Sequence, residues 1–366
     1  MPEADEILFA WGPGESRFAV VAAGRVVEFA VDRPDLLAGA LLLGRVAEVR
    51  PELDAAFVEL GSDRPGFLPG AAALGLSQGQ TVTVRVRTDA RGGKGALLAA
   101  AEPVGTDRKP PALLERPHPL ARLLAAHPGV RRVVVDDAAA FAEARRLFPD
   151  LAEHHRDGSA FDRHDAEEAF EQALSLSVPL PLGGRLTIEP TAALTAIDVD
   201  SGLGRPADAN REAVAAIARQ LRLRNIGGQV VVDFVSAKDR KASYKLAAAL
   251  KRAVADDPVP THVFGVTPLG LVELTRERRG PSLAELMLER GTAISPRAAA
   301  LAALRRVLAE AASRPGLAPL LVVAPEIATA LAACPEAVAE AERRLGRPLT
   351  IRAEAGRGRE DVGVEG

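Results

Sequence analysis

The sequence predicts a mixed α/β protein built from more than one domain. Its 366 residues exceed what one small hydrophobic core organises, which indicates two or three domains. Five short apolar stretches separated by Gly-rich turns, between Ala38 and Ala101, are typical of a small β-barrel of the OB type. Between residues 174 and 286, strand-like runs alternate with helix-like runs, as in a sheet covered by helices.

The first expected elements are short strands at residues 7–10, 18–21 and 25–29, with turns at Gly12 to Gly14 and at Gly24. The five expected barrel strands cover residues 39–49, 55–60, 66–68, 81–86 and 95–100. A Pro-rich linker at residues 109–119 precedes an expected strand at 132–136 and a helix at 138–147.

The region from residue 174 to 286 is expected to run strand, strand, helix, strand, helix, strand. Its first helix should cover residues 208–224, with Asp208 as N-cap and Gly227-Gly228 after its end. Its second helix should cover residues 238–254. Residues 298–352 indicate helix, strand, helix, helix and strand, and the charged, Gly-rich tail from Gly356 is expected to be mobile.

Charge and cysteine content limit the classes of protein and of partner. The net charge of −3 and the pI near 6.2 give no global basic field, so RNA binding would need local patches. The single cysteine, Cys334, excludes an internal disulfide and fits a reducing compartment. The acidic N-terminus lacks signal-peptide features, and no apolar run reaches about 18 residues. We therefore expect a cytoplasmic protein without a membrane partner.

Two aspartates interrupt apolar, strand-like runs. Asp198 follows Leu194–Ile197, and Asp233 follows Val230–Val232. A buried carboxylate is costly unless it is paired or holds a metal, although a single Asp near a strand end usually has a solvated or capping role. Asp200 lies two residues after Asp198, so it points the same way in a strand. Carboxylates converging at strand ends suit Mg²⁺, with Mn²⁺ as a second choice.

The stretch from Leu194 to Leu286 resembles the catalytic core of the ribonuclease E/G family. The matching pieces are, in order, residues 194–198, 216–224, 227–228, 231–234, 270–276 and 281–283. The resemblance implies a metal-dependent endoribonuclease that cleaves single-stranded RNA, with Mg²⁺ held by Asp198 and Asp233. A family Asn that supports the metal site falls on Asp200, which cannot donate a hydrogen bond as an amide does.

The same resemblance implies the domain organisation. Residues 1–34 and 106–173 would form a ribonuclease-H-like scaffold, with the OB-type RNA-binding barrel at 35–105 inserted between them. Residues 174–286 would form a deoxyribonuclease-like, metal-bearing half, and residues 287–366 a small C-terminal domain and tail. In the family that small domain helps to form dimers, so a homodimer would use it here.

Two features of the family have no counterpart in this sequence. The join after the barrel is too short for the sub-domain that senses a 5′-monophosphate on RNA. The junction at residues 286–292 contains no cysteine, so we expect no structural zinc linking two chains.

Several residues outside the metal site are candidates for RNA binding. Phe57 and Phe67 align with aromatics on which the family stacks bases, and Lys94 aligns with a family lysine near RNA. The alternative for each Phe is a place in the core, and for Lys94 a solvated turn. Arg219 and Arg276 belong to basic clusters near the aspartates, where phosphate contacts need cations.

The function most consistent with these residues is endonucleolytic cleavage of single-stranded RNA, in RNA processing or decay. Asp198, Asp233 and Asp200 form the candidate catalytic set. Two alternatives remain open: a non-catalytic RNA-binding protein of the same fold, and a metal-dependent nuclease acting on DNA. Stacking on an aromatic ring makes no contact with the 2′-hydroxyl of the sugar, so the barrel alone does not discriminate between RNA and DNA.

Overall fold

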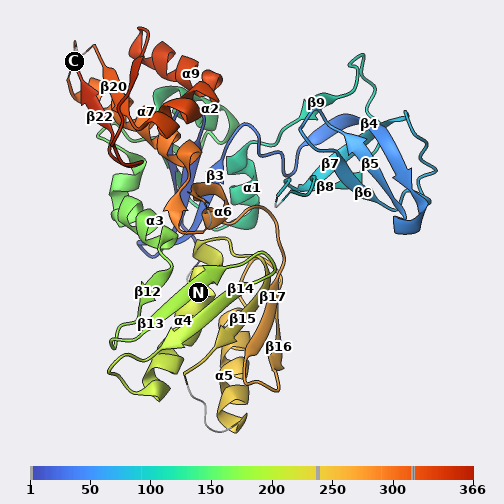
Figure 1. The fold of residues 1–366 in the computed structure, drawn as a ribbon, viewed down its shortest axis with the longest axis vertical. Helices are drawn as coiled ribbons and strands as arrows, with labels where there is room; N and C mark the ends of the chain where they lie inside the picture. The colour runs from blue at the N-terminus through green and yellow to red at the C-terminus, as the bar shows by residue number, and fades with distance from the viewer. Residues whose placement is uncertain (1–2, 92, 236–239, 290, 315, 317) are drawn as a thin grey trace. The chain divides into compact units, whose positions relative to one another are not determined.

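The computed structural model describes residues 3–91, 93–235, 240–289, 291–314, 316 and 318–366 (Figure 1). The chain divides into two compact units, which are described separately. The barrel unit comprises Pro34–Ala126 and Glu277–Pro281, and the main unit comprises the other three segments, 1–33, 127–276 and 282–366. Within the described ranges, no helix is both long and apolar enough to cross a membrane.

The barrel unit contains a closed barrel of five strands. They are β4 (Leu41–Arg50), β5 (Ala55–Glu59), β6 (Gly66–Pro69), β7 (Thr81–Thr88) and β8 (Leu97–Ala100), with the one-turn helix η1 (Pro51–Leu53) between β4 and β5. They pair in the order β5-β6-β8-β7-β4, and β4 pairs with β5 to close the ring. The five predicted strands are confirmed, and the ring is consistent with an OB-type fold.

The barrel unit extends beyond residue 105, where the sequence predicted its end. Strand β9 (Ala112–Glu115) pairs with β4, and α1 (Pro119–Ala126) follows it. The pairing with β4 is a contact between distant segments, which the Pro-rich composition of this stretch did not reveal.

The first sheet of the main unit joins the N-terminus to a later segment. Its strands are β1 (Glu6–Ala10), β2 (Ser16–Ala22), β3 (Arg25–Asp32), β10 (Arg132–Val135) and β11 (Ala152–His154), in the order β11-β10-β1-β2-β3. Helices α2 (Ala138–Leu147) and α3 (Ala166–Leu174) and the short helix η2 (Ala160–Asp165) accompany them. The predicted strands and α2 are confirmed, and the parallel pairing of β1 with β10 brings the two segments together as predicted.

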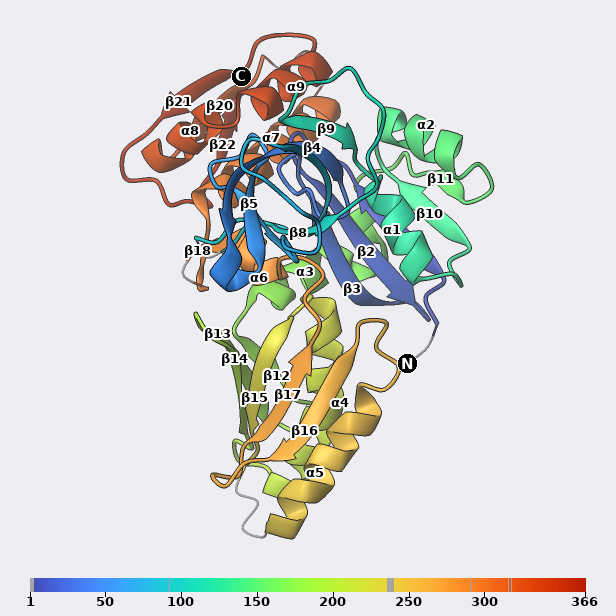
Figure 2. The same cartoon turned by 90° about the vertical axis from the view of Figure 1, so that its right-hand side faces the viewer.

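The second sheet of the main unit carries the two aspartates. It comprises β12 (Ser177–Pro179), β13 (Arg185–Pro190), β14 (Thr195–Asp200), β15 (Gly228–Asp233), β16 (Thr261–Val266) and β17 (Val272–Arg276). Their order is β12-β13-β14-β15-β17-β16, which makes β16 an edge strand. Helices α4 (Pro206–Leu223) and α5 (Arg240–Ala253) cover one face, as Figure 2 shows. Ile197, Ile217, Val232 and Leu250 pack in the core between helices and sheet.

The predicted boundaries of α4 need correction. Arg205 occupies the N-cap position and Pro206 begins the helix, because proline fits the first turn, where its missing N–H costs nothing. Asp208 therefore lies inside the first turn. After the helix ends, Asn225 adopts a left-handed backbone conformation, two residues before the glycines that were predicted to follow the helix. Residues 238 and 239 of the second predicted helix lie outside the described residues.

The C-terminal part of the main unit begins with a helix and a short hairpin, α6 (Leu283–Met287), β18 (Leu288–Glu289) and β19 (Ala293–Ile294). It contains α7 (Pro296–Ser313), β20 (Leu320–Val323), α8 (Pro325–Ala332), α9 (Pro335–Leu345), β21 (Thr350–Ala353) and β22 (Gly363–Glu365). The predicted order is confirmed, but the tail is not mobile as expected. Strand β22 pairs with β20, and Arg359 forms ion pairs with Glu289 and Glu326.

Candidate active site and RNA-binding surface

Asp198 and Asp233 lie directly opposite each other on adjacent parallel strands. In the register of β14 with β15 the two residues are partners, and neighbouring strands lie about 4.8 Å apart. Ile197 and Val232, one residue earlier on each strand, are buried against the helices. The alternation of side chains therefore turns both carboxylates to the opposite face of the sheet, where both are exposed.

Neither carboxylate is neutralised by a residue that the structure describes. Among the described residues, Asp198 and Asp233 have no recorded hydrogen bond or ion pair, and no cluster of three or more His, Cys, Asp or Glu residues could hold a metal. A pair of free carboxylates still fits Mg²⁺, which is often bound by one or two carboxylates together with water and substrate phosphate. The two residues thus suit a hard divalent cation.

Asp200 lies beside this pair but is occupied by other groups. Its Oδ2 lies 2.8 Å from Nη2 of Arg185, and its Oδ1 accepts a hydrogen bond of 2.8 Å from the backbone N–H of Gly202. Both oxygens are therefore used to hold β13 and the loop after β14. A Cβ at Gly202 would lie 2.6 Å from the carbonyl oxygen of Gly183, so this turn requires glycine.

Two residues of α4 fix the backbone around the carboxylates. Asn210 is buried, donates to the carbonyl of Val235 at 2.9 Å and accepts from its N–H at 3.0 Å, which anchors the chain just after Asp233. Glu212 accepts a hydrogen bond of 3.1 Å from the N–H of Leu182, in the loop before β13. The sequence alone does not show which backbone groups these two side chains hold.

Phe57, Phe67 and Lys94 meet at one pocket of about 490 Å³ in the barrel unit. Phe57 on β5 and Phe67 on β6 are partners in register, and their ring centroids lie 5.8 Å apart at a steep angle. Both are partly exposed, whereas Val58 and Leu68, next to them in sequence, are buried in the barrel core. The two rings therefore lie on the outer face of the barrel, outside its core.

Further residues of this pocket carry no motif in the sequence. Arg64 and Leu97 line it, and the side chain of Arg64 donates to the carbonyl of Gly93. Leu97 is 40 % exposed, which leaves apolar surface beside the two rings. Only the folded barrel brings these residues together, because Arg64 and Leu97 come from separate turns and strands.

Residues 97–279, half of the chain, match the family model described as Ribonuclease E/G family. The chain belongs to the ribonuclease E/G family. It is 39 % identical to ribonuclease E of Nostoc sp. over 176 residues, which cover 43 % of this chain and 26 % of that protein. It is 26 % identical to ribonuclease G of Salmonella typhimurium over 399 residues, covering 77 % of this chain and 81 % of that protein.

The ribonuclease E/G relatives differ in how much of their length this chain spans. A chloroplastic ribonuclease E/G-like protein of Arabidopsis thaliana is 34 % identical over 219 residues, which is 54 % of this chain and 22 % of that protein. This chain thus spans about a quarter of ribonuclease E and most of ribonuclease G. The alignment with ribonuclease G has 399 positions but covers 77 % of the 366 residues here, so many residues of that relative have no counterpart in this chain.

The two arginines expected to bind RNA have different environments. Arg219 on α4 is exposed and donates to the carbonyl of Val26 at 3.3 Å; partial burial and the neighbouring Arg25 lower its pKa. Arg276 on β17 is buried and forms a bidentate pair with buried Asp257, at 2.8 and 3.2 Å. Its Nη1 also donates to the carbonyl of Ile226 at 3.2 Å. The expectation that Arg276 contacts RNA is therefore wrong, and it fastens β17 instead.

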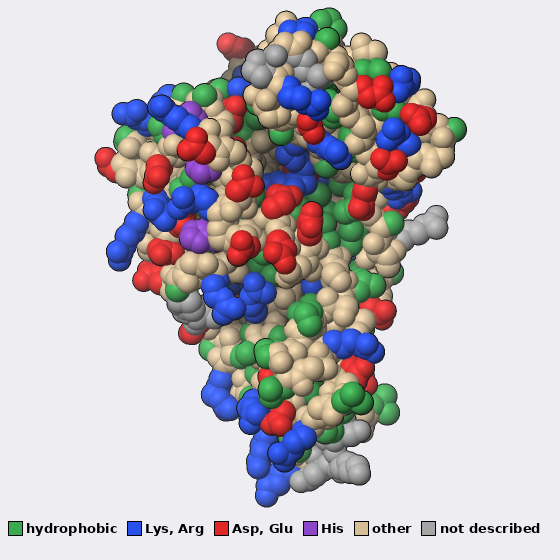
Figure 3. All heavy atoms as spheres, turned by 90° about the vertical axis from the view of Figure 1, so that its left-hand side faces the viewer, with side chains coloured by type: hydrophobic (Ala, Val, Ile, Leu, Met, Phe, Trp, Pro, Cys, Tyr) green, Lys and Arg blue, Asp and Glu red, His purple; other side chains and the backbone are tan. Residues whose placement is uncertain are grey.

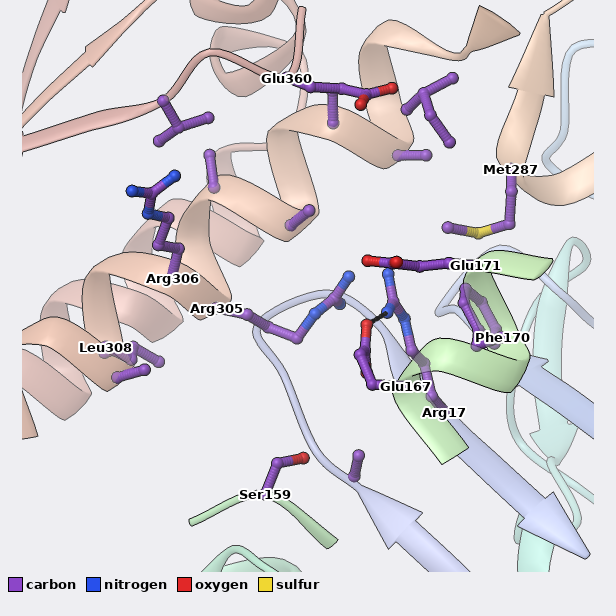
Figure 4. Close-up of a pocket in the computed structure, with 18 of the residues that line it drawn as sticks. Arg17, Ser159, Glu167, Phe170, Glu171, Met287, Arg305, Arg306, Leu308 and Glu360 are labelled. Carbon is purple, nitrogen blue, oxygen red and sulfur yellow. Dashed lines mark hydrogen bonds and ion pairs between the residues drawn. The ribbon is translucent and has the colours of Figure 1, made fainter. Parts of the chain in front are cut away.

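A cavity of about 1600 Å³ lies in the main unit, lined in part by α3 and α7. The hollow in the upper half of the face in Figure 3 has basic side chains at its back and acidic ones below. Figure 4 shows Arg17, Arg305 and Glu167 converging in the cavity, where Arg17 pairs with Glu167 at 3.2 Å.

Behind these groups, Glu15 is fully buried and within 2.9 Å of Arg17, Arg33 and Arg305. Burial alone would raise the pKa of Glu15, but the three guanidinium groups, Arg305 first, lower it to about 2. Burial, together with the neighbouring charge of Arg17, lowers the pKa of Arg305 to about 10. These arginines are committed to carboxylates, so this cavity lacks the excess positive charge that RNA binding requires.

Proposed function

We propose that this chain is a divalent-metal-dependent endoribonuclease that cleaves single-stranded RNA, in RNA processing or decay. The observation that carries the proposal is the pair Asp198 and Asp233, which lie opposite each other on an exposed sheet face, without partners among the described residues. Membership of the ribonuclease E/G family supports the reaction and the substrate class. Mg²⁺ is the expected ion, and Mn²⁺ has the same oxygen preference.

The residues around the carboxylate pair would have separate roles in holding the metal ion and the substrate phosphate. Asp198 and Asp233 would hold the ion, which when bound polarises the phosphate and lowers the pKa of a water molecule that it binds. Arg185 keeps most of its guanidinium N–H groups free of Asp200 and is 61 % exposed, so it can orient a phosphate oxygen. Asn210 holds the end of β15, so that Asp233 stays opposite Asp198.

The barrel pocket would bind bases of the single-stranded RNA substrate. Stacking on an aromatic ring is worth about 1–3 kcal/mol per base and accepts any base. Phe57 and Phe67 offer two such rings, and Lys94 adds a cation at the rim. This arrangement favours single-stranded over double-stranded nucleic acid, because paired bases do not expose their faces.

Three finer expectations belong to the same proposal. The main-unit sheet order β11-β10-β1-β2-β3 supports a ribonuclease-H-like scaffold, and the second sheet with α4 and α5 supports a deoxyribonuclease-like half. A 5′-sensor sub-domain is expected to be absent, and the many residues of ribonuclease G that have no counterpart in this chain are compatible with that expectation. A homodimer would form through the small C-terminal domain, without zinc.

The deciding experiment is incubation of purified protein with labelled RNA and with DNA of the same sequence, with Mg²⁺, with Mn²⁺ and with chelator. The proposal requires internal cuts in the RNA with either ion and none with chelator. Binding of RNA without any cut under all conditions would identify a non-catalytic RNA-binding protein. Equal cutting of the DNA would assign the broader activity of a metal-dependent nuclease.

A further inference from the structure

Helix α5 carries a one-sided basic surface. Its residues Arg240–Ala253 include five Lys or Arg and no Asp or Glu, although acidic residues outnumber basic ones in the whole chain, 49 to 46. Leu250 is buried against the sheet, whereas Lys245, Lys251 and Arg252 are exposed. The positive charge of this helix is therefore concentrated on its outer side.

Three cations of this side are not neutralised within the described part of the chain. Lys245, Lys251 and Arg252 have no recorded ion pair or side-chain hydrogen bond there. The helix dipole favours Lys251 and Arg252 in the last turn, but it gives no reason for the exposed Lys245 in the middle of the helix. Stability of the helix alone thus does not account for the pattern, and an anionic partner would.

Two aromatic side chains are strongly exposed on α5 and on the neighbouring strand β16. Tyr244, the single tyrosine of the chain, lies on α5 and is 51 % exposed, and Phe264 on β16 is 70 % exposed. They are the only aromatic residues among the large, strongly exposed hydrophobic side chains of the described residues. Exposed aromatics interleaved with cations are the composition of surfaces that bind single-stranded nucleic acid.

The position of Phe264 connects this surface with the carboxylate pair. Val263 and Val266 both pack toward the core, and a bulge between Val263 and Gly265 leaves Phe264 pointing to the opposite face. That face also carries Asp233, two strands away, which is a lateral spacing of about 10 Å across the sheet. Strand β16 forms the edge of the sheet, and α5 packs beside it in Figures 1 and 2. A single-stranded nucleic acid that contacts Phe264 can therefore pass around this edge of the sheet and reach α5.

We propose that the α5–β16 surface, consisting of Tyr244, Lys245, Lys251, Arg252 and Phe264, binds the single-stranded RNA that flanks the scissile phosphate. Bases stack on the two rings, and the three cations contact phosphates of the same strand. The inference rests on the proposed function and adds a second binding surface to that of the barrel. A membrane surface fits less well, because an interfacial helix turns its apolar face outward, whereas the apolar face of α5 packs on the sheet.

The test measures binding by the full-length chain in chelator, so that no cleavage occurs. The probe is fluorescent single-stranded RNA, in a short form and in a long form. The triple variant Lys245→Ala, Lys251→Ala, Arg252→Ala should weaken binding of the long RNA and lower the slope of log affinity against log salt by about two, since each phosphate contact on a single strand contributes about 0.7. Tyr244→Ala and Phe264→Ala should each weaken binding about five- to 150-fold.

A matched control removes the same charge elsewhere in the main unit. Arg131, Arg146 and Arg347 are exposed, and alanine at these three positions should leave the salt slope unchanged. In Mg²⁺, the α5 triple variant should raise KM for the long RNA without changing kcat, and should cut the short RNA normally. If the α5 variants fold and bind the long RNA with unchanged affinity and unchanged salt slope, the inference is overturned. It is also overturned if the variants lose binding to anionic lipid vesicles while their binding to RNA is unchanged. Because binding is measured without metal, absence of cleavage would count against the proposed function only.

Discussion

Replacing Asp198 or Asp233 with asparagine tests the metal site through the sign of a stability change. With no metal bound, two like charges about 5 Å apart repel by about 0.8 kcal/mol in water and about 3 kcal/mol at an effective dielectric constant of 20. Both side chains are exposed, so the smaller figure applies. Each variant should therefore unfold in chelator at the same temperature as the native protein or slightly higher.

Addition of Mg²⁺ should reverse that order. A ligand that binds only the folded state stabilises it by about 2.7 kcal/mol at one hundred times its dissociation constant. An asparagine amide is a much weaker ligand for Mg²⁺ than a carboxylate, so Asp198→Asn and Asp233→Asn should lose this gain. Loss of several kcal/mol of charge stabilisation should also slow RNA cleavage by at least about a thousandfold.

The assay is thermal unfolding across an Mg²⁺ titration, together with single-turnover cleavage of labelled RNA. Glu189→Gln is the matched control, because Glu189 is an exposed carboxylate on β13, on the same face as Asp198. It should keep both the Mg²⁺ response and the cleavage rate. The reasoning is refuted if the asparagine variants unfold at a lower temperature in chelator but retain the Mg²⁺ response and cut RNA normally.

The remaining predictions concern other parts of the molecule. Phe57→Ala and Phe67→Ala should each weaken RNA binding by about 1–3 kcal/mol; a large fall in melting temperature with unchanged affinity would instead assign a packing role. Arg276→Ala should lower the free energy of unfolding by about 3–5 kcal/mol, because it leaves Asp257 buried and unpaired, and denaturant titration should show this. The lowered pKa of Glu15 contributes roughly 3 kcal/mol to the free energy of unfolding. This contribution is complete above pH 4.5 and is lost as the pH falls toward 2. In the Glu15→Gln variant, the free energy of unfolding should therefore change less with pH between 4.5 and 2. RNAs with a 5′-monophosphate and with a 5′-hydroxyl should be cut at similar rates in parallel reactions, and a strong preference for the monophosphate would reveal a sensing site elsewhere.

Local patterns in the sequence were sufficient for most secondary structure. The five barrel strands were predicted because short Val- and Leu-rich runs alternate with Gly-rich turns, and both signals are local. The errors occur where distant contacts decide the structure. Strand β9 exists because β4 offers it a partner, and β22 orders the tail because β20 has a free edge. Neither partner can be identified from the few residues of β9 or β22 themselves.

The sequence shows which residues near the candidate site are basic, but it does not show which of them are exposed and which are paired inside the protein. A sequence lists Arg276 and Lys245 as equal cations, but one is buried against Asp257 and the other is exposed on α5. The difference arises from Asp257, which precedes β16 and reaches β17 only after the two strands pair. The buried carboxylate of Asp257 therefore excludes Arg276 as an RNA-binding residue, although the basic composition around Arg276 favoured that role.

The aspartates show the reverse relation between sequence and structure. Their apolar surroundings suggested that Asp198 and Asp233 were buried, which would have required a metal or a partner to offset the cost of burial. The strands are indeed packed, but alternation turns only Ile197, Val232 and their neighbours inward, and the carboxylates are exposed. Metal binding is instead favoured by a feature that the sequence alone does not show. Parallel pairing of β14 and β15 holds two like charges in register, without a cation from the described protein between them. Such an arrangement opposes folding slightly, and a divalent ion binding there would convert that repulsion into attraction.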